Sequence, residues 1–251
     1  MTGLLAAFLT LGSMAGQTRV IAHRGYWTAE GSAQNSIASL EKAQALGVYG
    51  SECDVAITAD GVVVVNHDDS IQGIGIETSA YADLQAVKLQ NGESLPTLEA
   101  YLQTGKKKPD TRLIVEIKPH KRIVNEDRAV QTVLYLVDQY GMADQVDYIS
   151  FSMNVCKELI LRAPSAPVFY LAGDVSPADL KVLGMAGLDY HKAVFERHPQ
   201  WIAEAHALGL AVNVWTVNEP ADIDKFIRAG VDFITTDKPV EGMQQTTSAA
   251  T

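Results

Sequence analysis

Three acidic residues lie within apolar runs, where a carboxylate is uncommon unless it binds something. Glu52 and Asp54 are two positions apart in an extended run, so both side chains project from one face. Glu116 lies in a second run of the same kind. Three converging carboxylates are costly to bury unless a cation accompanies them or their pKa values rise strongly. Carboxylate oxygens suit hard cations, so we expect one divalent cation, Mg²⁺ or Ca²⁺.

Two histidines end similar runs. His23 follows residues 20–22, and His67 follows residues 62–65. Either one alone is more often a structural histidine, but as a pair beside acids they are candidates for a general base and a general acid. Arg24 and Lys118 follow strand ends too, and a guanidinium and an ammonium both bind phosphate oxygens. A solvated surface position is an equally good interpretation of either cation taken alone.

These residues need a fold that gathers the ends of strands. From residue 19 onward, short β-rich runs alternate with segments of helical period, which is typical of βα units around a parallel sheet. Eight strands are expected, at 20–22, 49–56 with an extension at 62–65, 113–117, 146–151, 168–171, 188–190, 211–215 and 232–235. Eight units in one domain predict an α/β fold of the (β/α)8 TIM barrel type, whose chemistry lies at the carboxyl ends of the strands.

Helices are expected between these strands. The first covers 36–46, with Asn35 as its N-cap and Gly47 at its end. Others are expected at 125–140, after Asn154, after Pro177, at 199–208 and at 220–229. The glycine-rich stretch 69–97 has no clear period and predicts a small insertion after the second strand.

Composition excludes several classes of protein. The formal net charge is −10, and the lysines and arginines are scattered, so no nucleic acid partner is expected. No GxGxxG or GxxxxGK[ST] motif indicates nucleotide binding. Cys53 and Cys156 have no metal or redox spacing and are expected to be buried apolar side chains. Without a long basic amphipathic helix, stable membrane insertion is not expected, and the partner is a small molecule; the oligomeric state stays open.

Both ends of the chain differ from the barrel. The apolar run 4–11 is too short to span a bilayer, and Ser13 and Ala15 supply the small residues of a cleavage site. We therefore expect a signal peptide over 1–15 and a periplasmic or secreted protein, although the usual positive charge at the start is missing. An N-terminal helix or leader is the alternative. The barrel domain is expected over 16–241, and the small polar residues of 242–251 predict a flexible tail.

An ordered set of short motifs spans almost the whole barrel. The set is His23-Arg24-Gly25, Asn35-Ser36, Glu52-Cys53-Asp54-Val55, Thr58, Asp60-Gly61, His67-Asp68, Leu95-Pro96-Thr97-Leu98, Glu116-Ile117-Lys118 and Thr235-Thr236-Asp237-Lys238-Pro239. In this order it resembles the glycerophosphodiester phosphodiesterase family over residues 20–239. The triplet His23-Arg24-Gly25 alone is weak evidence for a family, whereas the whole ordered set of motifs is specific. Residues 69–76 depart from the family's usual pattern, so the chemistry is better supported than the alcohol released.

The resemblance implies a TIM barrel with an insertion after the second strand. It implies Glu52, Asp54 and Glu116 as ligands of the metal, and His23 and His67 as the acid–base pair. The implied reaction is metal-dependent hydrolysis of a glycerophosphodiester to glycerol 3-phosphate and an alcohol, through a cyclic phosphate. Which histidine acts first as the base stays open.

Four further residues receive roles from the same resemblance. Arg24 and Lys118 are implied as phosphate-binding residues, and Asn35 as a residue that orders the site. Trp215 is implied as an apolar wall for the glycerol or the head group, and a buried barrel residue is an equally good interpretation. The alternatives in function are a phosphatidylinositol-type phosphodiesterase, a TIM-barrel glycosidase and a barrel that binds phosphorylated ligands without catalysis.

Overall fold

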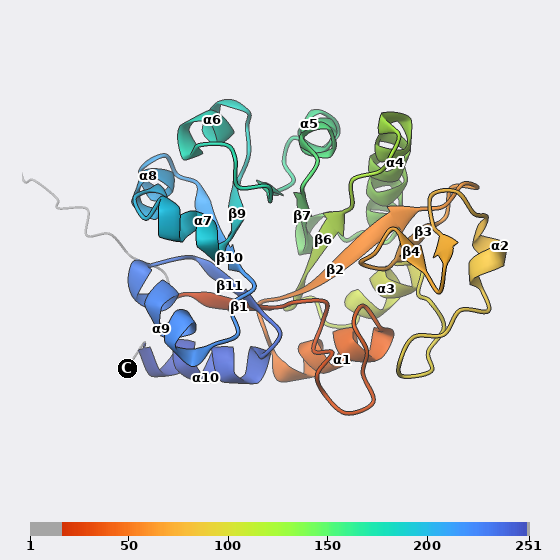
Figure 1. Ribbon diagram of the computed structural model, residues 1–251, viewed down its shortest axis with the longest axis horizontal. Helices are drawn as coiled ribbons and strands as arrows, with labels where there is room; N and C mark the ends of the chain where they lie inside the picture. Colours follow the sequence, from red (N-terminus) through yellow and green to blue (C-terminus); the bar gives the residue numbers. More distant parts are fainter. Residues whose placement is uncertain (1–16, 250–251) are drawn as a thin grey trace, which may run out of the picture.

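The barrel strands are parallel and close into a ring. The computed structural model describes residues 17–249. The parallel strands in that range are β1 (Arg19–Ala22), β2 (Gly50–Ile57), β6 (Arg112–Ile117), β7 (Val146–Ser150), β8 (Val168–Tyr170), β9 (Gly187–His191), β10 (Ala211–Trp215) and β11 (Phe233–Thr236). Their order is β1-β11-β10-β9-β8-β7-β6-β2, and the pairing of β1 with β2 closes the ring. Figure 1 shows the strands at the centre and the helices outside them. The predicted TIM barrel is confirmed.

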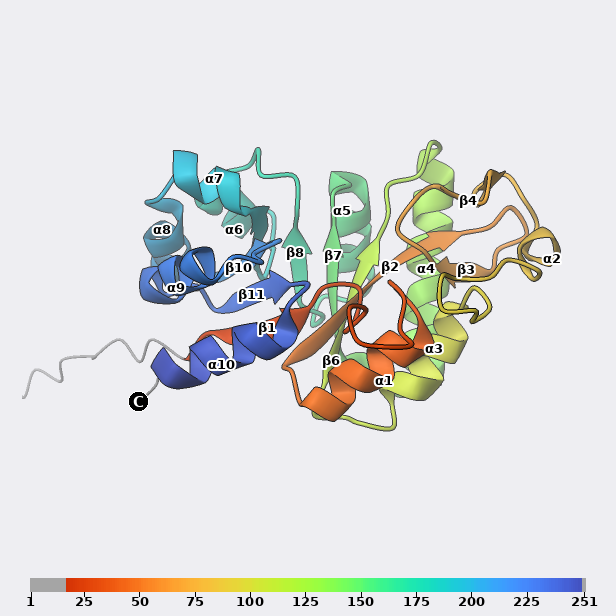
Figure 2. The same cartoon turned by 60° about the horizontal axis from the view of Figure 1, so that its bottom comes forward.

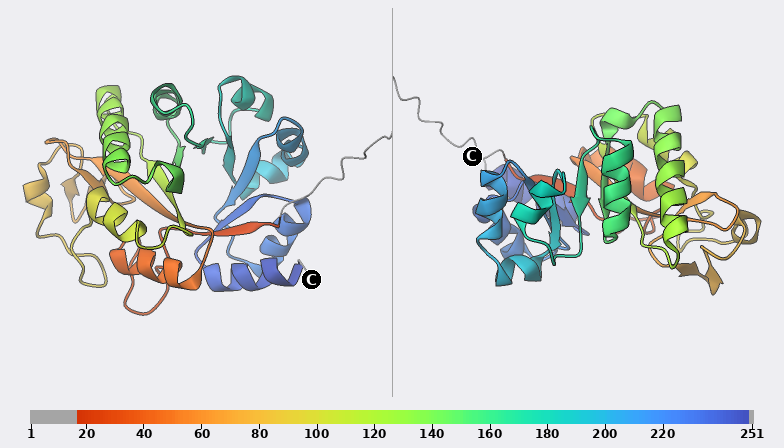
Figure 3. Two further views of the ribbon diagram at one scale, coloured as in Figure 1. Left: turned by 180° about the vertical axis from the view of Figure 1, so that it is seen from behind. Right: turned by 90° about the horizontal axis from the view of Figure 1, so that it is seen from above.

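The helices pack on the outer face of the strands. They are α1 (Ile37–Leu46), α3 (Leu98–Gly105), α4 (Ile123–Gln139), α5 (Met153–Arg162), α6 (Pro177–Val182), α7 (Lys192–Arg197), α8 (Trp201–Ala207), α9 (Pro220–Ala229) and α10 (Pro239–Ala249), with a short 3-10 helix at Ala143–Gln145. The largest apolar cluster joins strand residues to α1 and to α3 through α9. Neighbouring helices also pack on each other, as α4 and α5 do in Figure 3. Cys53 and Cys156 are free and buried in this cluster, as expected.

The predicted insertion is present and is held to the barrel by two carboxylates. It contains β3 (Val63–Val65), which is antiparallel to β2, then β4 (Ser70–Ile71), β5 (Ile74–Gly75) and α2 (Tyr81–Leu84). Figure 2 shows it projecting at one side of the barrel. Glu77 accepts hydrogen bonds at 2.9 and 3.2 Å from the two backbone N–H groups before α4. Glu93 accepts bonds from the first two N–H groups of α1. Because negative charge stabilises helix N-termini, the insertion supports the two helices that follow site loops.

An apolar layer fills the middle of the barrel. Ile21, Ile114, Ile149, Phe169 and Phe233 from five strands belong to one buried cluster. Below this layer, at the amino ends of the strands, Arg112 forms a salt bridge with Asp147. The layer therefore separates the two ends of the barrel and gives the carboxyl end a dry floor.

Two local predictions are wrong. Ser36, and not Asn35, is the N-cap of α1, since the Ser36 side chain accepts a hydrogen bond from the Ser39 N–H. Residues 242–249, expected to be a loose tail, belong to α10, which packs along β1 (Figure 2). Gly242 permits the approach, because a Cβ at this position would lie 3.3 Å from Val20. The predicted signal peptide at 1–15 lies outside the described residues. Among residues 17–249, no helix has the length and apolar character needed to cross a membrane.

Candidate active site

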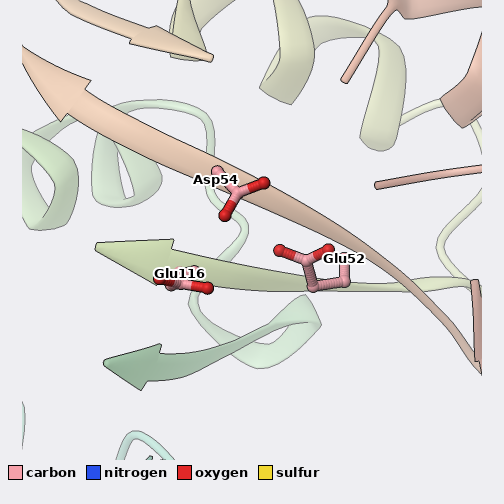
Figure 4. Close-up of side chains that lie close together, drawn as sticks. All are labelled: Glu52, Asp54 and Glu116. Carbon is pink, nitrogen blue, oxygen red and sulfur yellow. The ribbon is translucent and has the colours of Figure 1, made fainter. Parts of the chain in front are cut away.

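The three predicted metal-binding acids meet inside the barrel. Asp54 on β2 and Glu116 on β6 are register partners, and Glu52 precedes Asp54 by two residues on the same face. Oxygens from all three lie within 4.8 Å of one another. All three residues are buried, with exposed fractions of 3%, 1% and 7% for Glu52, Asp54 and Glu116. Figure 4 shows the carboxylates turned toward one another from two neighbouring strands. A cation placed among them would contact oxygen atoms from all three residues.

Burial and mutual repulsion oppose ionisation of all three acids at once. Burial, followed by the charges of Asp54 and Glu116, raises the pKa of Glu52 well above its usual range. Burial and Asp54 raise the pKa of Glu116 to about 8. Burial acts on Asp54 in the same direction, but Lys118 and a hydrogen bond from Asn35 leave the pKa of Asp54 below its usual value. Glu52 Oε1 has no hydrogen-bond partner within residues 17–249. An orphaned buried oxygen beside two more acids fits a divalent cation.

Polar neighbours orient Asp54. Asn35 Nδ2 donates to Asp54 Oδ2 at 2.9 Å, and Asn35 Oδ1 accepts from the Asp54 N–H at 3.1 Å. Lys118 Nζ lies 3.2 Å from Asp54 Oδ1 and 2.8 Å from Glu116 Oε1. Arg24 Nε lies 3.6 Å from Asp54 Oδ2. Asp54 is thus held by an amide and two cationic side chains. The ammonium group of Lys118 also contacts Glu116, so its positive charge offsets negative charge on both acids.

A left-handed turn after β1 brings a backbone donor to the acids. Arg24 and Gly25 have φ values of 55° and 75°. This turn directs the Arg24 N–H to Glu52 Oε2 at 2.7 Å. Glycine is required at position 25 because a Cβ there would lie 2.4 Å from Ser39 Oγ. The Arg24 guanidinium contacts Asp54 through Nε and also donates from Nη1 to Gln34 Oε1 at 2.7 Å.

His23 is held by a carboxylate from the last strand of the barrel. Its Nδ1 lies 2.8 Å from Asp237 Oδ1, just beyond β11. Trp27 Nε1 donates to the same oxygen at 2.9 Å, and Asn218 Nδ2 donates to Asp237 Oδ2 at 2.7 Å. Although partial burial raises the pKa of Asp237, these hydrogen bonds lower it to about 2. An ionised Asp237 accepts a hydrogen bond from the Nδ1–H group of His23. Nε2 is therefore the ring nitrogen that can gain or lose a proton during the reaction.

His67 has a different environment. Its Nδ1 lies 2.7 Å from Asp68 Oδ1, and the Asp68 side chain is 75% exposed. Burial lowers the pKa of His67, and Lys118 and Arg24 act in the same direction. The charge of Asp54 and the hydrogen bond to Asp68 oppose this effect without reversing it. His67 is therefore mainly neutral near pH 7, the state in which an imidazole accepts a proton.

A cavity of about 200 Å³ joins the histidines to the acids. Its lining consists of His23, Arg24, Glu52, His67, Glu116, Ile149, Phe151, Leu171, Asp189, Trp215, Thr216 and Thr235. Trp215 forms part of the apolar wall; its ring packs edge-on against Phe151, and its Nε1 donates to the Asp189 backbone oxygen at 2.9 Å. The cavity thus has acids and histidines on one side and an aromatic wall on the other.

Of the nine predicted site residues, six line this cavity: His23, Arg24, Glu52, His67, Glu116 and Trp215. Asp54 lies behind them, in contact with both Asn35 and Lys118. The structure therefore gathers all nine at one end of the barrel, and no predicted site residue lies elsewhere. Lys118 contacts acids, so its approach to a phosphate depends on how those acids are occupied.

The site and the fold agree with comparisons to known proteins. The model of the Glycerophosphoryl diester phosphodiesterase family matches residues 23–241. The chain belongs to this family. A glycerophosphodiester phosphodiesterase from Caldanaerobacter subterraneus subsp. tengcongensis is 29% identical over 238 residues, which are 89% of this chain and 95% of that protein. Membership confirms the resemblance found in the sequence and the expectation of an enzyme of this kind.

Two solved structures superpose well on this one. A glycerophosphodiester phosphodiesterase from Parabacteroides distasonis is 49% identical with a TM-score of 0.92, over 94% of this chain and 99% of that one. A phosphodiesterase from Oleispira antarctica, solved with the product sn-glycerol-3-phosphate, has a TM-score of 0.80 over 92% of this chain and 97% of that one. At 24% identity, this second likeness is one of fold.

Four residues that the structure brings to this site, Asp237, Trp27, Asn218 and Asp189, received no role from the sequence. Asp237 was visible as an acid just beyond a strand end, and that position is the signal that indicates a partner for a strand-end histidine. Trp27 and Asn218 lie in loops, and nothing in the sequence around them indicates a shared contact with Asp237. Asp189 was hidden within a strand that the sequence describes only as apolar and short.

Proposed function

We propose that this protein hydrolyses glycerophosphodiesters to sn-glycerol 3-phosphate and an alcohol, using one divalent cation and two histidines. The observation that carries the proposal is the shared cavity: His23 and His67 line it together with Glu52 and Glu116. Family membership supplies the substrate class. The product bound to the Oleispira antarctica phosphodiesterase is consistent with the product proposed for this chain.

The cation would be held by Glu52, Asp54 and Glu116. Their oxygens are close enough to share one ion, and the raised pKa values of Glu52 and Glu116 reflect a charge that a cation would offset. An all-carboxylate set favours Mg²⁺ or Ca²⁺ over thiophilic metals. When bound, the ion supplies positive charge to the phosphoryl group and lowers the pKa of a nearby hydroxyl.

The two histidines divide the proton transfers. The C2 hydroxyl of the glycerol arm attacks phosphorus, and its proton passes to His67, which is neutral near pH 7. His23 gives the proton on Nε2 to the leaving alcohol, while Asp237 holds the ring by Nδ1. The product of this step is a cyclic phosphate. Water then adds at phosphorus, its proton passes to His23, and His67 returns a proton to the C2 oxygen as the ring opens.

The remaining predicted residues would bind rather than transfer protons. Arg24 lines the cavity beside the acids and would contact phosphoryl oxygens. Lys118 would do so from behind Asp54 and Glu116 once a cation takes over their charge. Trp215 would pack against the carbon skeleton of the substrate.

The test is release of sn-glycerol 3-phosphate from glycerophosphocholine and glycerophosphoethanolamine in Mg²⁺, Ca²⁺ or EDTA. We expect release by the wild type in one of the metals, none in EDTA, and none from His23→Ala. His206→Ala is the matched control, because His206 pairs with Asp232 outside the barrel.

Each alternative function gives a different result in this assay. Hydrolysis of a glycoside in EDTA, with no release from any diester, would favour a glycosidase, whereas release from a diester in EDTA would remove the cation from the proposal. A preference for phosphatidylinositol over every glycerophosphodiester would favour the phosphatidylinositol-type reaction. Binding of glycerol 3-phosphate without release from any diester would favour a non-catalytic barrel, and the proposal would be withdrawn.

We also propose that the protein is exported and cleaved after Ala15. The support is the apolar run 4–11 followed by small residues. Mass spectrometry of protein from the periplasm or the medium should give a mature chain that begins at Gly16. An intact chain that begins at Met1 in the cytoplasm would contradict this.

A further inference from the structure

Asp189 is a buried acid that the proposed reaction does not use. It lies in the middle of β9, with a side chain directed into the barrel and an exposed fraction of 2%. Six glutamates and aspartates are buried within the described range, namely Glu52, Asp54, Glu116, Glu126, Asp147 and Asp189. The first three form the proposed cation site, Asp147 is paired with Arg112, and Glu126 accepts bonds from Ser152 and Asn154. Asp189 has no equivalent arrangement.

Asp189 lines the catalytic cavity and also a smaller cavity among Ile21, Ile114, Phe169 and Phe233, within the apolar layer of the barrel. Asp189 Oδ1 has no hydrogen-bond partner in the part of the chain that the structure describes, and no lysine or arginine there forms a salt bridge with it. Burial raises the pKa of Asp189 to about 7, against a hydrogen bond from Asn213 that lowers it. Native proteins seldom leave a buried polar atom unpaired, because desolvation is costly. Because Asp189 lines the catalytic cavity, a ligand hydroxyl there would give its carboxyl group a further hydrogen-bond partner.

The shape of the cavity indicates which part of a diester reaches Asp189. Asp189 is fully enclosed by the barrel, whereas Phe151, also in the lining, is 36% exposed. The alcohol arm varies in size among diesters and therefore fits the open side near Phe151. The glycerol arm is constant, and its C2 hydroxyl must lie beside the histidines. Its terminal hydroxyl then extends past them toward the closed end.

We propose that Asp189 selects the glycerol arm of the substrate by hydrogen bonding to its terminal hydroxyl. This inference rests on the proposed function for the identity of the substrate. Trp215 links the aromatic wall of the cavity to Asp189, because its Nε1 donates a hydrogen bond to the Asp189 backbone oxygen at 2.9 Å. Thr235, bonded to Asn213 at 2.8 Å, completes a polar patch in an otherwise apolar floor. Asp189 is thus a specificity residue, separate from the groups that transfer protons.

The test uses ligands that differ only in the terminal hydroxyl. Calorimetric binding in Mg²⁺ compares sn-glycerol 3-phosphate with propane-1,2-diol 1-phosphate, which keeps the C2 hydroxyl and lacks the terminal one. The wild type should prefer the glycerol ligand by roughly 10- to 100-fold, the usual effect of leaving a buried polar group unpaired. The preference should fall to about 1 in Asp189→Leu, and Asp189→Asn, which keeps a hydrogen-bonding oxygen, should restore part of it. Asp138→Asn, an exposed acid on α4, controls for charge.

A turnover arm separates this inference from the proposed function. The values of kcat/KM for choline diesters of glycerol and of propane-1,2-diol should show the same preference and the same loss in Asp189→Leu. If no diester is cleaved while the binding preference depends on Asp189, the proposed function fails and this inference stands. Turnover with a preference unchanged in Asp189→Leu overturns the inference alone.

Two other outcomes would also overturn it. A loss in Asp189→Leu that is confined to cationic head groups, and absent for glycerophosphoglycerol, would make Asp189 a site for the leaving alcohol. A lower melting temperature with equal loss on both ligands would make Asp189 a structural residue. The proposal expects Asp189→Leu to melt at or above the wild type, since the variant removes a buried acid that has one unpaired oxygen and no cationic partner among the described residues.

Discussion

Replacing Asp237 with asparagine tests whether this carboxylate sets the proton position on His23. Asp237 Oδ1 accepts bonds from His23 Nδ1 at 2.8 Å and Trp27 Nε1 at 2.9 Å, and Oδ2 accepts from Asn218 Nδ2 at 2.7 Å. An asparagine has one oxygen and one NH₂ group. In one orientation the NH₂ faces the Asn218 donor, and in the other it faces His23 and Trp27. In either orientation two hydrogen-bond donors face each other. In the second orientation the proton of the neutral His23 ring must move from Nδ1 to Nε2.

The expected loss follows from these contacts. A histidine held in the wrong tautomer or orientation loses about 10²- to 10⁴-fold in kcat, or about 3–5 kcal/mol of barrier. Stability changes less. The pKa of Asp237 falls from 3.8 to about 2, and about two pKa units correspond to about 2.5 kcal/mol before screening. Because the Asp237 side chain is 22% exposed, we expect about 1–2 kcal/mol at pH 7.

The sign of the pH dependence is a second readout. Since folding lowers the pKa of Asp237, its stabilisation is complete above 3.8 and is lost as the pH falls toward about 2. The difference in unfolding free energy between wild type and Asp237→Asn should therefore shrink over that range. Urea unfolding at several pH values measures it.

Asp232→Asn provides a matched control for the assay. Asp232 holds His206 at 2.9 Å and the Val212 N–H at 2.8 Å on the outside of the barrel. It should lose comparable stability with kcat unchanged in the release assay. If Asp237→Asn keeps kcat within about threefold of the wild type while it is folded, the assigned role of Asp237 is refuted.

Three other predictions concern the acids and His67. Asn35→Gly should weaken Mg²⁺ binding by about 10- to 100-fold in calorimetry, because both bonds to Asp54 are lost while the φ of 60° at this position is kept. Asn35→Ala should lose about 1 kcal/mol more of unfolding free energy from backbone strain, and wild-type metal affinity in Asn35→Gly would contradict the ordering role. A divalent cation at about 100 times its dissociation constant should stabilise the metal-free protein against thermal unfolding by about 2.7 kcal/mol. The gain in stability should be smaller in Glu52→Gln. No gain in the wild type would rule out the cation site. One limb of the profile of kcat/KM against pH should lie below 6.5, with activity falling toward acid, because burial lowers the pKa of His67 and a base must be neutral. Asp68→Asn removes a bond that raises this pKa, so the limb should move to still lower pH, and a limb above 6.5 would assign the base elsewhere.

Local sequence patterns were sufficient for the barrel and for the acids. Alternating strands and helices predicted the parallel ring, and the spacing of Glu52 and Asp54 placed both on one face, because side chains alternate along a strand. The same reasoning failed where two local choices were close. Asn35 and Ser36 are both good N-cap residues. The Asn35 side chain is hydrogen-bonded to Asp54, and Ser36 is the residue that caps α1. Residues 242–249 have weak local preferences, and packing against β1 makes them helical.

The sequence by itself determined the fold class, the family and the identity of the acids and histidines, since each depends on residue type and on spacing within a segment. Only the tertiary structure decided how these groups are tuned. The bond between His23 and Asp237 joins residues 214 positions apart, and no local pattern carries that information. Asp189 is the stronger case, because an unpaired buried oxygen is defined by what surrounds it in space. Closure of the ring by β1, β2 and β11 sets these contacts, since it brings the first and last strands of the barrel together.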